Sequence, residues 1–307
     1  MILFFLRSCL VIVFYSIFLT PVSAQVTPPD ERPFLKLTEI NIMNTQIKKA
    51  DLCPKKESDH KYHHKLFLID TTTQLKQTQI ELIKRLLLSE EQLRRIHPYD
   101  RITIMKLRGV APQANKPALS MCRPRSGDQN SPYKLDKHDW LVETERELNT
   151  HFKRLVDGVE GVFTNINNTE VSESDPSYVG GSPIMEQLKE ISRIPDYKFD
   201  EYAGYQKRTL TIVSDLHQNT ERIPFYDYCK IGRNNNCPSF EEFKKQKKIK
   251  RWIEKTIPDF GENIEVKFFY LNTLSDPNLD REVLEFWEDY FIEAGIDNFD
   301  YEIESDS

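Results

Sequence analysis

The chain has 307 residues, 39% of them hydrophobic, which is enough apolar material to bury a core in one large domain or two small ones. It carries 42 Lys and Arg residues against 48 Asp and Glu residues, a formal net charge of −6. This balance argues against nucleic acid as the partner, because phosphate binding is driven by a basic surface. The mixed charge and the many aromatic residues argue against a disordered chain.

The first 24 residues are typical of an export signal. An apolar stretch runs from Cys9 to Leu19, and Val22 and Ala24 occupy the −3 and −1 positions of a signal-peptidase cleavage site. The alternative is an uncleaved N-terminal anchor. In both cases we expect the rest of the chain to be exported, as a periplasmic or secreted protein. The expected organisation is a signal peptide over 1–24, a polar N-terminal extension over 25–62 and a folded domain over 63–307.

The exported part of the chain contains an even number of cysteines, which favours disulfides in an oxidising compartment. They are Cys53, Cys122, Cys229 and Cys237. Of the three possible pairings we favour Cys229 with Cys237, across a short loop, and Cys53 with Cys122. The sequence contains no Cys-x-x-Cys motif, so zinc-ribbon and thioredoxin-like interpretations have no support.

Apolar runs of strand length alternate with segments of helical periodicity. Strands are expected at 64–70, 101–109, 116–122, 208–215, 263–271 and 299–305, the third returning beside the second as a hairpin. Helices are expected at 75–88, 138–163, 183–193, 239–256 and 280–295. This alternation predicts an α/β fold: a doubly wound, mainly parallel central sheet with helices on both faces and one antiparallel edge strand.

Polar groups occur in three loops next to these elements. They are the loop 70–74 after the first strand, the loop 180–182 before a helix, and Ser214 with Asp215 after the fourth strand. Ligands of such sheets bind outside the carboxyl ends of the strands. Two carboxylates with several hydroxyls make an all-oxygen donor set, which suits Mg or Mn rather than zinc.

The order of elements, with the motifs LFLIDTTTQ, GGSPIMEQL and LTIVSDLHQ at successive loops, resembles the von Willebrand factor type A (vWA) domain. The resemblance covers about residues 63–305 and implies a Rossmann-like three-layer sandwich. In that family the first loop contains Asp-x-Ser-x-Ser, the second loop supplies a Thr and the third an Asp, around a metal-ion-dependent adhesion site (MIDAS).

The resemblance implies a metal-binding role for particular residues of this chain. Asp70 matches the first acid, Thr72 the first hydroxyl and Asp215 the last acid, while Ser182 stands where the family has Thr. Gln74 falls on the second Ser position and departs from the family pattern. Its amide oxygen is able to ligate a hard cation, but its longer side chain would displace the metal or leave its place to water.

The same residues also have structural explanations. Thr71 followed three residues later by Gln74 fits a capping box. Ser182 before Pro183 fits a helix N-cap followed by proline at the first helical position. The two aspartates would then simply accept backbone N–H groups at helix starts.

Two further clusters have alternative interpretations. Asp59, His60, His63 and His64 form either a transition-metal site or a solvated segment before the first strand. The Lys- and Arg-rich segment 243–252 either contacts anionic lipid or an acidic partner, or is the solvated face of a helix.

We therefore expect a non-enzymatic protein-binding domain, for adhesion or assembly, that binds an acidic side chain of a protein partner with the help of Mg or Mn. One alternative is a metal-free structural subunit of a cell-envelope or secretion-type assembly. A lower-ranked alternative is a metal-assisted hydrolase using Asp70 and Asp215, for which no general base is evident. Nucleic acid is not an expected partner, and membrane contact is expected only through an uncleaved N-terminal segment or the basic helix.

Overall fold

The computed structural model describes residues 51–53, 62–89, 96–97, 99–124, 144–164, 166–167, 179, 181–229, 237–271 and 277–303. All of them belong to the second of the two units into which the chain divides, Leu35–Ser307. The expected signal peptide and most of the expected extension lie outside this part, as do Asp59 and His60.

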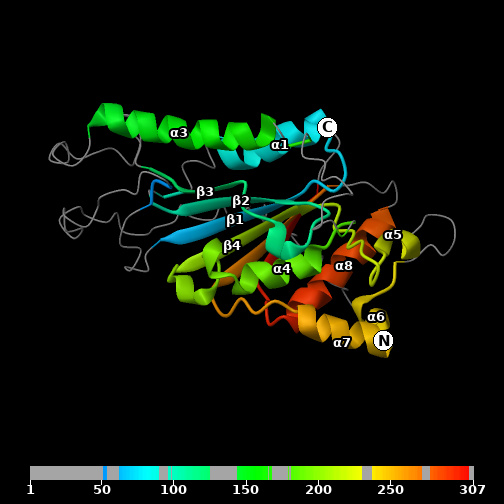
Figure 1. Cartoon of the computed structure of the whole chain (residues 1–307). Coiled ribbons are helices and arrows are strands. Elements are labelled where there is room, and N and C mark those ends of the chain that lie inside the picture. Colours follow the sequence, from blue (N-terminus) through cyan, green and yellow to red (C-terminus); the bar gives the residue numbers. More distant parts are fainter. Residues whose placement is uncertain are drawn as a thin grey trace, which may run out of the picture. The chain divides into compact units, whose positions relative to one another are not determined.

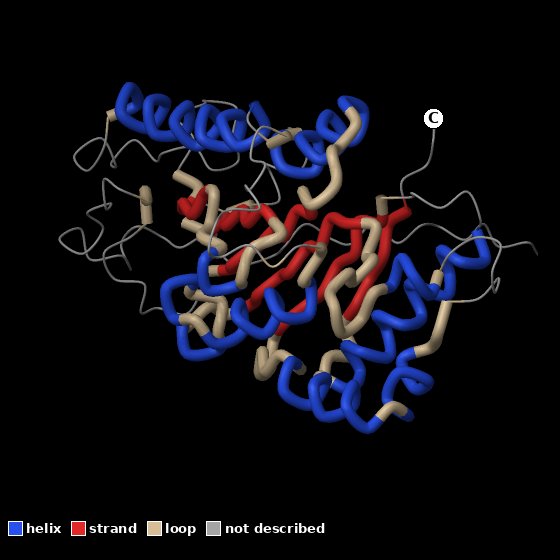
Figure 2. The backbone as a smooth tube through the Cα atoms, turned by 45° about the vertical axis from the view of Figure 1, so that its right-hand side comes forward, coloured by secondary structure: helices blue, strands red, loops and turns tan. Residues whose placement is uncertain are grey.

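A six-stranded sheet forms the centre of the fold, in the order β3-β2-β1-β4-β5-β6 (Figure 2, red). The strands are β1 (His63–Asp70), β2 (Arg101–Leu107), β3 (Leu119–Cys122), β4 (Lys207–Ser214), β5 (Ile264–Tyr270) and β6 (Phe299–Ile303). β3 pairs with β2 antiparallel, and all other neighbours pair parallel. The predicted mainly parallel sheet, its hairpin and its antiparallel edge strand are thereby confirmed.

Helices cover both faces of this sheet and complete a three-layer sandwich. Figure 1 shows α1 (Gln77–Leu88) and α3 (Glu145–Thr164) on one side, with α4 (Ile184–Arg193), α7 (Lys247–Thr256) and α8 (Pro277–Glu293) on the other. Shorter helices are α5 (Phe225–Tyr228), α6 (Phe240–Lys245) and three 3₁₀ turns, Pro112–Ala114, Pro195–Tyr197 and Glu201–Ala203.

The central strand β1 explains why there are two hydrophobic cores. Leu66 and Leu68 belong to the core shared with α4, α7 and α8, and Phe67 and Ile69 belong to the core shared with α1 and α3. Successive side chains of a strand point to opposite faces, so a strand covered on both faces must be apolar throughout. The strand ends at Asp70, which lies at the carboxyl edge of the sheet.

The predicted helix 239–256 is wrong in one respect, because the structure divides it at Gln246 into α6 and α7. Phe240, Phe243, Trp252 and Ile253 all belong to one core. In a single straight helix these four side chains would point around more than half of the circumference, so no one face would bury them all. The extended backbone at Gln246 (φ −81°, ψ 109°) gives the two short helices different directions.

The other predicted elements agree with the structure to within a few residues. The predicted helix 138–163 is described from Glu145 onwards as α3, and its first residues lie outside the described part. Leu148, Leu155, Val159 and Val162 are buried, which confirms that this stripe faces the core.

Both favoured disulfides are present, Cys53–Cys122 and Cys229–Cys237. Closing loops of 69 and 8 residues would stabilise the fold by about 4 and about 3 kcal/mol in the chain-entropy model. Such cross-links persist in oxidising compartments. Among the described residues there is no helix both long and apolar enough to cross a membrane.

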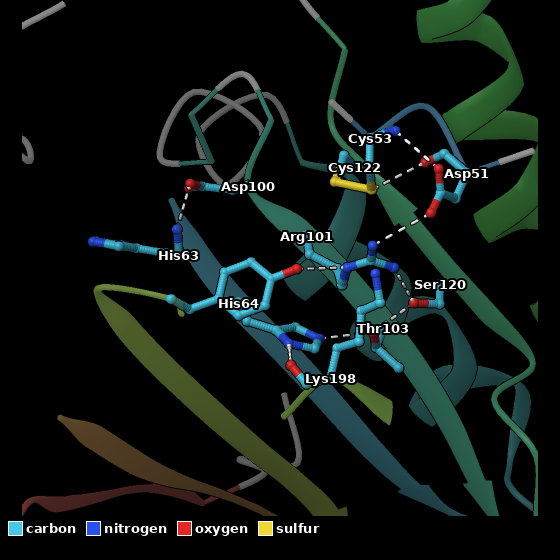
Figure 3. Close-up of a disulfide and its surroundings, with 11 residues drawn as sticks. Asp51, Cys53, His63, His64, Asp100, Arg101, Thr103, Ser120, Cys122 and Lys198 are labelled. Atoms are coloured by element: carbon cyan, nitrogen blue, oxygen red, sulfur yellow. Dashed lines mark hydrogen bonds and ion pairs between the residues drawn. A yellow bond between two sulfur atoms is a disulfide. The ribbon is translucent and has the colours of Figure 1, made fainter. Parts of the chain in front are cut away.

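The first disulfide ties the segment 51–53 to the sheet beside a buried arginine (Figure 3). The guanidinium of Arg101 donates to Asp51 Oδ2 at 3.3 Å and to Ser120 Oγ at 3.0 Å. The backbone N–H of Cys122 donates to the carbonyl of Asp51 at 2.8 Å. The end of the predicted extension is therefore fixed to β2 and β3 by covalent, ionic and backbone contacts.

Candidate functional site

The carboxylate of Asp70 joins three separate segments of the chain. Oδ1 accepts hydrogen bonds from the backbone N–H of Thr72 (3.0 Å) and from its hydroxyl (2.6 Å). Oδ2 accepts from the hydroxyls of Ser182 and Ser214, both at 2.8 Å. The residue is only 5% exposed. Two of the three predicted loops are thus hydrogen-bonded to the acid at the end of the first strand.

Strand pairing brings Ser214 to Asp70. β1 and β4 are parallel neighbours in which Ile69 lies opposite Val213, so the next residue of each strand reaches the same edge. Parallel strands present their carboxyl ends together, which is why ligands of such sheets bind there. The hydroxyl of Ser214 also accepts the N–H of Leu216 at 2.9 Å.

Ser182 is held in place by a reciprocal backbone bridge. Its N–H donates to the carbonyl of Asn219 (2.8 Å), and the N–H of Asn219 donates back to its carbonyl (3.0 Å). The preceding residue, Gly181, has φ +63°, and a Cβ there would lie 1.8 Å from the Asn219 oxygen. Only glycine fits this position without moving the bridge.

Asp215 follows Ser214 directly and is 6% exposed. Its Oδ1 accepts the N–H of His217 at 3.0 Å. Between them Leu216 has φ +57°, an uncommon conformation for a branched side chain. The indole N–H of Trp287 donates to the Leu216 carbonyl at 2.7 Å and holds this turn against α8. The third loop is therefore a rigid support for its carboxylate.

Burial and the nearby charge of Asp215 together raise the pKa of Asp70, with burial the larger cause. Hydrogen bonds from Thr72 and Ser214 act in the opposite direction. Both causes of the rise disfavour the ionised carboxylate. A cation bound between Asp70 and Asp215 would favour the ionised form of both carboxylates and so lower the pKa of Asp70.

The donor set fits a hard divalent cation. Asp70 and Asp215 supply carboxylates, and the hydroxyls of Thr72 and Ser182 bond to Asp70 as donors, which leaves their oxygen lone pairs available. Mg and Mn prefer oxygen ligands of this kind. Among the residues that the structure describes, there is no group of three or more His, Cys, Asp or Glu side chains placed to hold a metal.

Gln74 is exposed, and the capping box predicted for Thr71 and Gln74 is wrong. α1 begins only at Gln77, and its first turn is capped by Gln79, whose side-chain oxygen accepts the N–H of Lys76 at 3.0 Å. Thr71 instead donates its hydroxyl to the carbonyl of Leu107 at 2.9 Å. The loop after β1 is longer than the pattern suggested, because this hydrogen bond continues the contact of the chain with β2 past the strand end.

The other two structural explanations are also wrong. α4 begins at Ile184 and Pro183 occupies its N-cap position, so the Ser182 hydroxyl caps no helix. Asp70 and Asp215 each accept an N–H two residues further along, in turns that precede the next helices by several residues. These three side chains, Asp70, Ser182 and Asp215, are therefore used at the edge of the sheet rather than at helix ends.

The sequence analysis missed the part played by Gln218. This fully buried side chain accepts the N–H of Met185 at 2.9 Å and donates to Glu186 at 2.8 Å. Burial is the main cause that raises the pKa of Glu186. The amide thus connects the third loop to the first turn of α4. The glutamine at the end of the LTIVSDLHQ motif is Gln218, and it was the feature of the sequence that could have indicated this role.

The two described histidines of the cluster before β1, His63 and His64, do not reach this site. His63 and His64 begin the strand that Asp70 ends, and the backbone N–H of His63 donates to Asp100 at 2.8 Å. The ring of His64 is bonded to the Lys198 carbonyl and the Thr103 hydroxyl, both at 2.8 Å (Figure 3). Neither histidine is placed to act at the carboxyl edge.

Comparison of the chain with protein-family models and with curated proteins finds no match. The fold and the site define an α/β three-layer domain with a buried, acid- and hydroxyl-lined centre at the carboxyl edge of its sheet.

Proposed function

We propose that this chain is an exported protein-binding domain of the vWA kind, which binds an acidic side chain of a protein partner at the carboxyl edge of its sheet with the help of Mg or Mn. The observation that carries the proposal is the convergence on Asp70 of hydroxyls from positions 72, 182 and 214, three segments distant in sequence. The mainly parallel sheet with one antiparallel edge strand is what the resemblance to the vWA family implies.

The residues have distinct roles in this proposal. Asp70 and Asp215 would hold the cation with the hydroxyls of Thr72 and Ser182, while Ser214 orients Asp70 through its hydrogen bond. Gln74 is exposed and is assigned no direct contact. The bound cation would supply a positive charge to which a partner's carboxylate is attracted. The two disulfides support export, because such bonds persist outside the cytosol.

The test is calorimetric titration of Mg²⁺ and Mn²⁺ into metal-stripped protein. We expect micromolar to low-millimolar binding that Asp70→Asn abolishes. The matched control is Asp157→Asn, which removes an exposed carboxylate paired with Lys153 on α3 and should leave the titration unchanged. An acidic peptide immobilised on a sensor surface should then retain the protein only when the cation is present.

A metal-free structural subunit of an envelope assembly is the second candidate. One observation favours it: the four hydrogen bonds to Asp70 already occupy the acceptor positions of its carboxylate without a metal. In that case the titration would release no heat, and Asp70→Asn would change only the melting temperature. A metal-assisted hydrolase ranks lower, because the described histidines nearest to Asp70 in sequence, His63 and His64, lie roughly 20 Å along β1 from it and are too far to serve as a general base.

A further inference from the structure

The solvent-facing side of α7 carries a continuous basic face. Its exposed cations are Lys247, Lys248, Lys250, Arg251 and Lys255, interrupted by one acid, Glu254. At 100° per residue these positions cover an arc of roughly 160°. The opposite side of the helix is anchored by Trp252 and Ile253, which are 9% and 1% exposed. The charged side of α7 is therefore fixed towards solvent.

These cations form no ion pair among the described residues, although the chain as a whole is acidic. The ion pairs of the neighbouring α6 use Lys244, which contacts Glu241 and Glu293 at 3.0 and 2.9 Å. On β4 and β5, Lys207 and Lys267 both contact Glu265. These five basic side chains on α7 therefore have no ionic partner in the described part and are available to a negatively charged surface.

The edge strand β6 presents the complementary charge. β6 is an edge strand of the sheet, and its exposed side chains include Asp300, Tyr301 and Glu302. Tyr301 is 51% exposed, one of four large apolar side chains of the described part that face solvent. Asp300 and Glu302 form no ion pair within the described residues. An edge strand exposes unpaired backbone groups and is open to association with another chain.

We propose that the basic face of α7 binds the acidic edge strand β6 of a second copy of this chain. Asp300 and Glu302 point to the same side of a strand, about 6.6 Å apart. Basic residues at i and i+4 of a helix, such as Arg251 and Lys255, have Cβ atoms roughly 5–6 Å apart, so two carboxylates of β6 match two cations of α7. Tyr301 points to the opposite face of the strand and takes no part in this contact.

A membrane surface fits this face less well. All the large apolar side chains of α7 point inward or are partly covered, so nothing remains to enter a lipid interface. The acids Asp200, Glu201 and Asp259 lie around the exposed Tyr202, near the loop that follows α7. With a net charge of −6, the chain as a whole is also repelled by anionic lipid.

The contact joins two different surface elements of the chain. Each copy offers one α7 face and one β6 strand, so both contacts formed between the same two copies would close a twofold dimer, and contacts formed with different copies would build a ring or an open chain. The cation site at the carboxyl edge takes no part in it, so the two proposals stand or fall separately.

The experiment measures self-association of the exported chain by sedimentation velocity in the presence of EDTA. We expect association that is strong at about 0.05 M salt and lost near 1 M, where the Debye length falls to about 3 Å. The variant Arg251→Gln/Lys255→Gln and the variant Asp300→Asn/Glu302→Gln should each lower the association constant about tenfold. The matched control Lys116→Gln/Arg146→Gln removes two exposed charges elsewhere and should have no effect.

A mixture of the two variants tests directly whether α7 of one copy binds β6 of another. One variant keeps β6 and the other keeps α7, so an equimolar mixture should form dimers and nothing larger. A monomer at low salt, or association that both variants retain, would overturn the proposal. The proposal would also be overturned if the protein did not self-associate but bound phosphatidylglycerol vesicles, and if the Arg251→Gln/Lys255→Gln variant lost that binding. This result would assign the basic face of α7 to a membrane.

Discussion

Ser182 donates its hydroxyl hydrogen bond to Asp70 Oδ2 over 2.8 Å, although 112 positions separate the two residues in sequence. Both side chains are at most 5% exposed. The bond connects the end of β1 to the loop before α4, and together with Ser214 it determines the orientation of the carboxylate.

Replacing this hydroxyl should weaken the fold measurably. Ser182→Ala leaves one buried carboxylate oxygen with one donor fewer, and we expect a loss of about 1–3 kcal/mol in the free energy of unfolding. Urea denaturation measures it. Ser182→Thr keeps the hydroxyl and is expected to retain most of the stability. Equal losses in both variants would show that side-chain volume, and not the hydrogen bond, is what the site requires.

The titration of Asp70 should contribute to the pH dependence of the free energy of unfolding. Its pKa is raised in the folded protein above the ordinary value of an aspartate, chiefly by burial and then by Asp215. Between the unfolded and the folded pKa the native state binds more protons than the unfolded state, so this contribution to stability falls as pH rises through that window.

We therefore expect wild type to gain stability relative to Asp70→Asn as the pH is lowered from 7 towards 4. Urea denaturation of both proteins at each pH measures this contribution together with that of the interacting Asp215, because the remaining titrating groups are common to the two. A difference that stays constant with pH would mean that Asp70 titrates as it does in the unfolded chain. Saturating Mg²⁺ should reduce the dependence if the site binds the cation.

Replacing Gly181 or Gly161 with alanine should change the stability in opposite directions. Gly181→Ala places a Cβ 1.8 Å from the Asn219 carbonyl oxygen at φ +63°, and a loss of at least about 1–3 kcal/mol is expected. Gly161→Ala lies in α3 with no atom within 4 Å of the new methyl group, and a gain of up to about 1 kcal/mol is expected. Thermal and urea unfolding test both, and a neutral Gly181→Ala would show that the bridge to Asn219 yields easily.

The protonation state of His64 follows from a chain of hydrogen bonds (Figure 3). Arg101 only donates, to Ser120 Oγ at 3.0 Å, and the Lys198 carbonyl only accepts, from His64 Nδ1 at 2.8 Å. Between these ends the Ser120 hydroxyl bonds to Thr103 at 3.0 Å, and the Thr103 hydroxyl bonds to His64 Nε2 at 2.8 Å.

A consistent direction through this chain makes His64 the neutral tautomer with its proton on Nδ1. Nitrogen-15 chemical shifts of the ring at neutral pH should show a protonated Nδ1 and an unprotonated Nε2. Thr103→Val removes the donor to Nε2 and should shift that resonance while leaving Nδ1 nearly unchanged. A protonated Nε2 in wild type would mean that Thr103 accepts from the ring instead.

The sequence by itself determined the types and the approximate bounds of the main elements and the sheet class, and it only favoured the cysteine pairing that the structure contains. Short-range periodicity carries this information, because alternation and helical spacing depend on neighbours within a few positions. It also indicated Asp70, Thr72, Ser182 and Asp215 as one polar centre, since the carboxyl ends of parallel strands meet at one edge.

Only the tertiary structure decided which atoms meet at that edge. Ser214 is bonded to Asp70 over 144 positions of sequence, and this contact depends on β4 lying next to β1. The break at Gln246 likewise follows from the need to bury Phe240 and Ile253 in the same core, which no local pattern expresses. Capping motifs predicted from spacing failed at Thr71 and Ser182 for the same reason: each hydroxyl has a distant partner that competes with the local one.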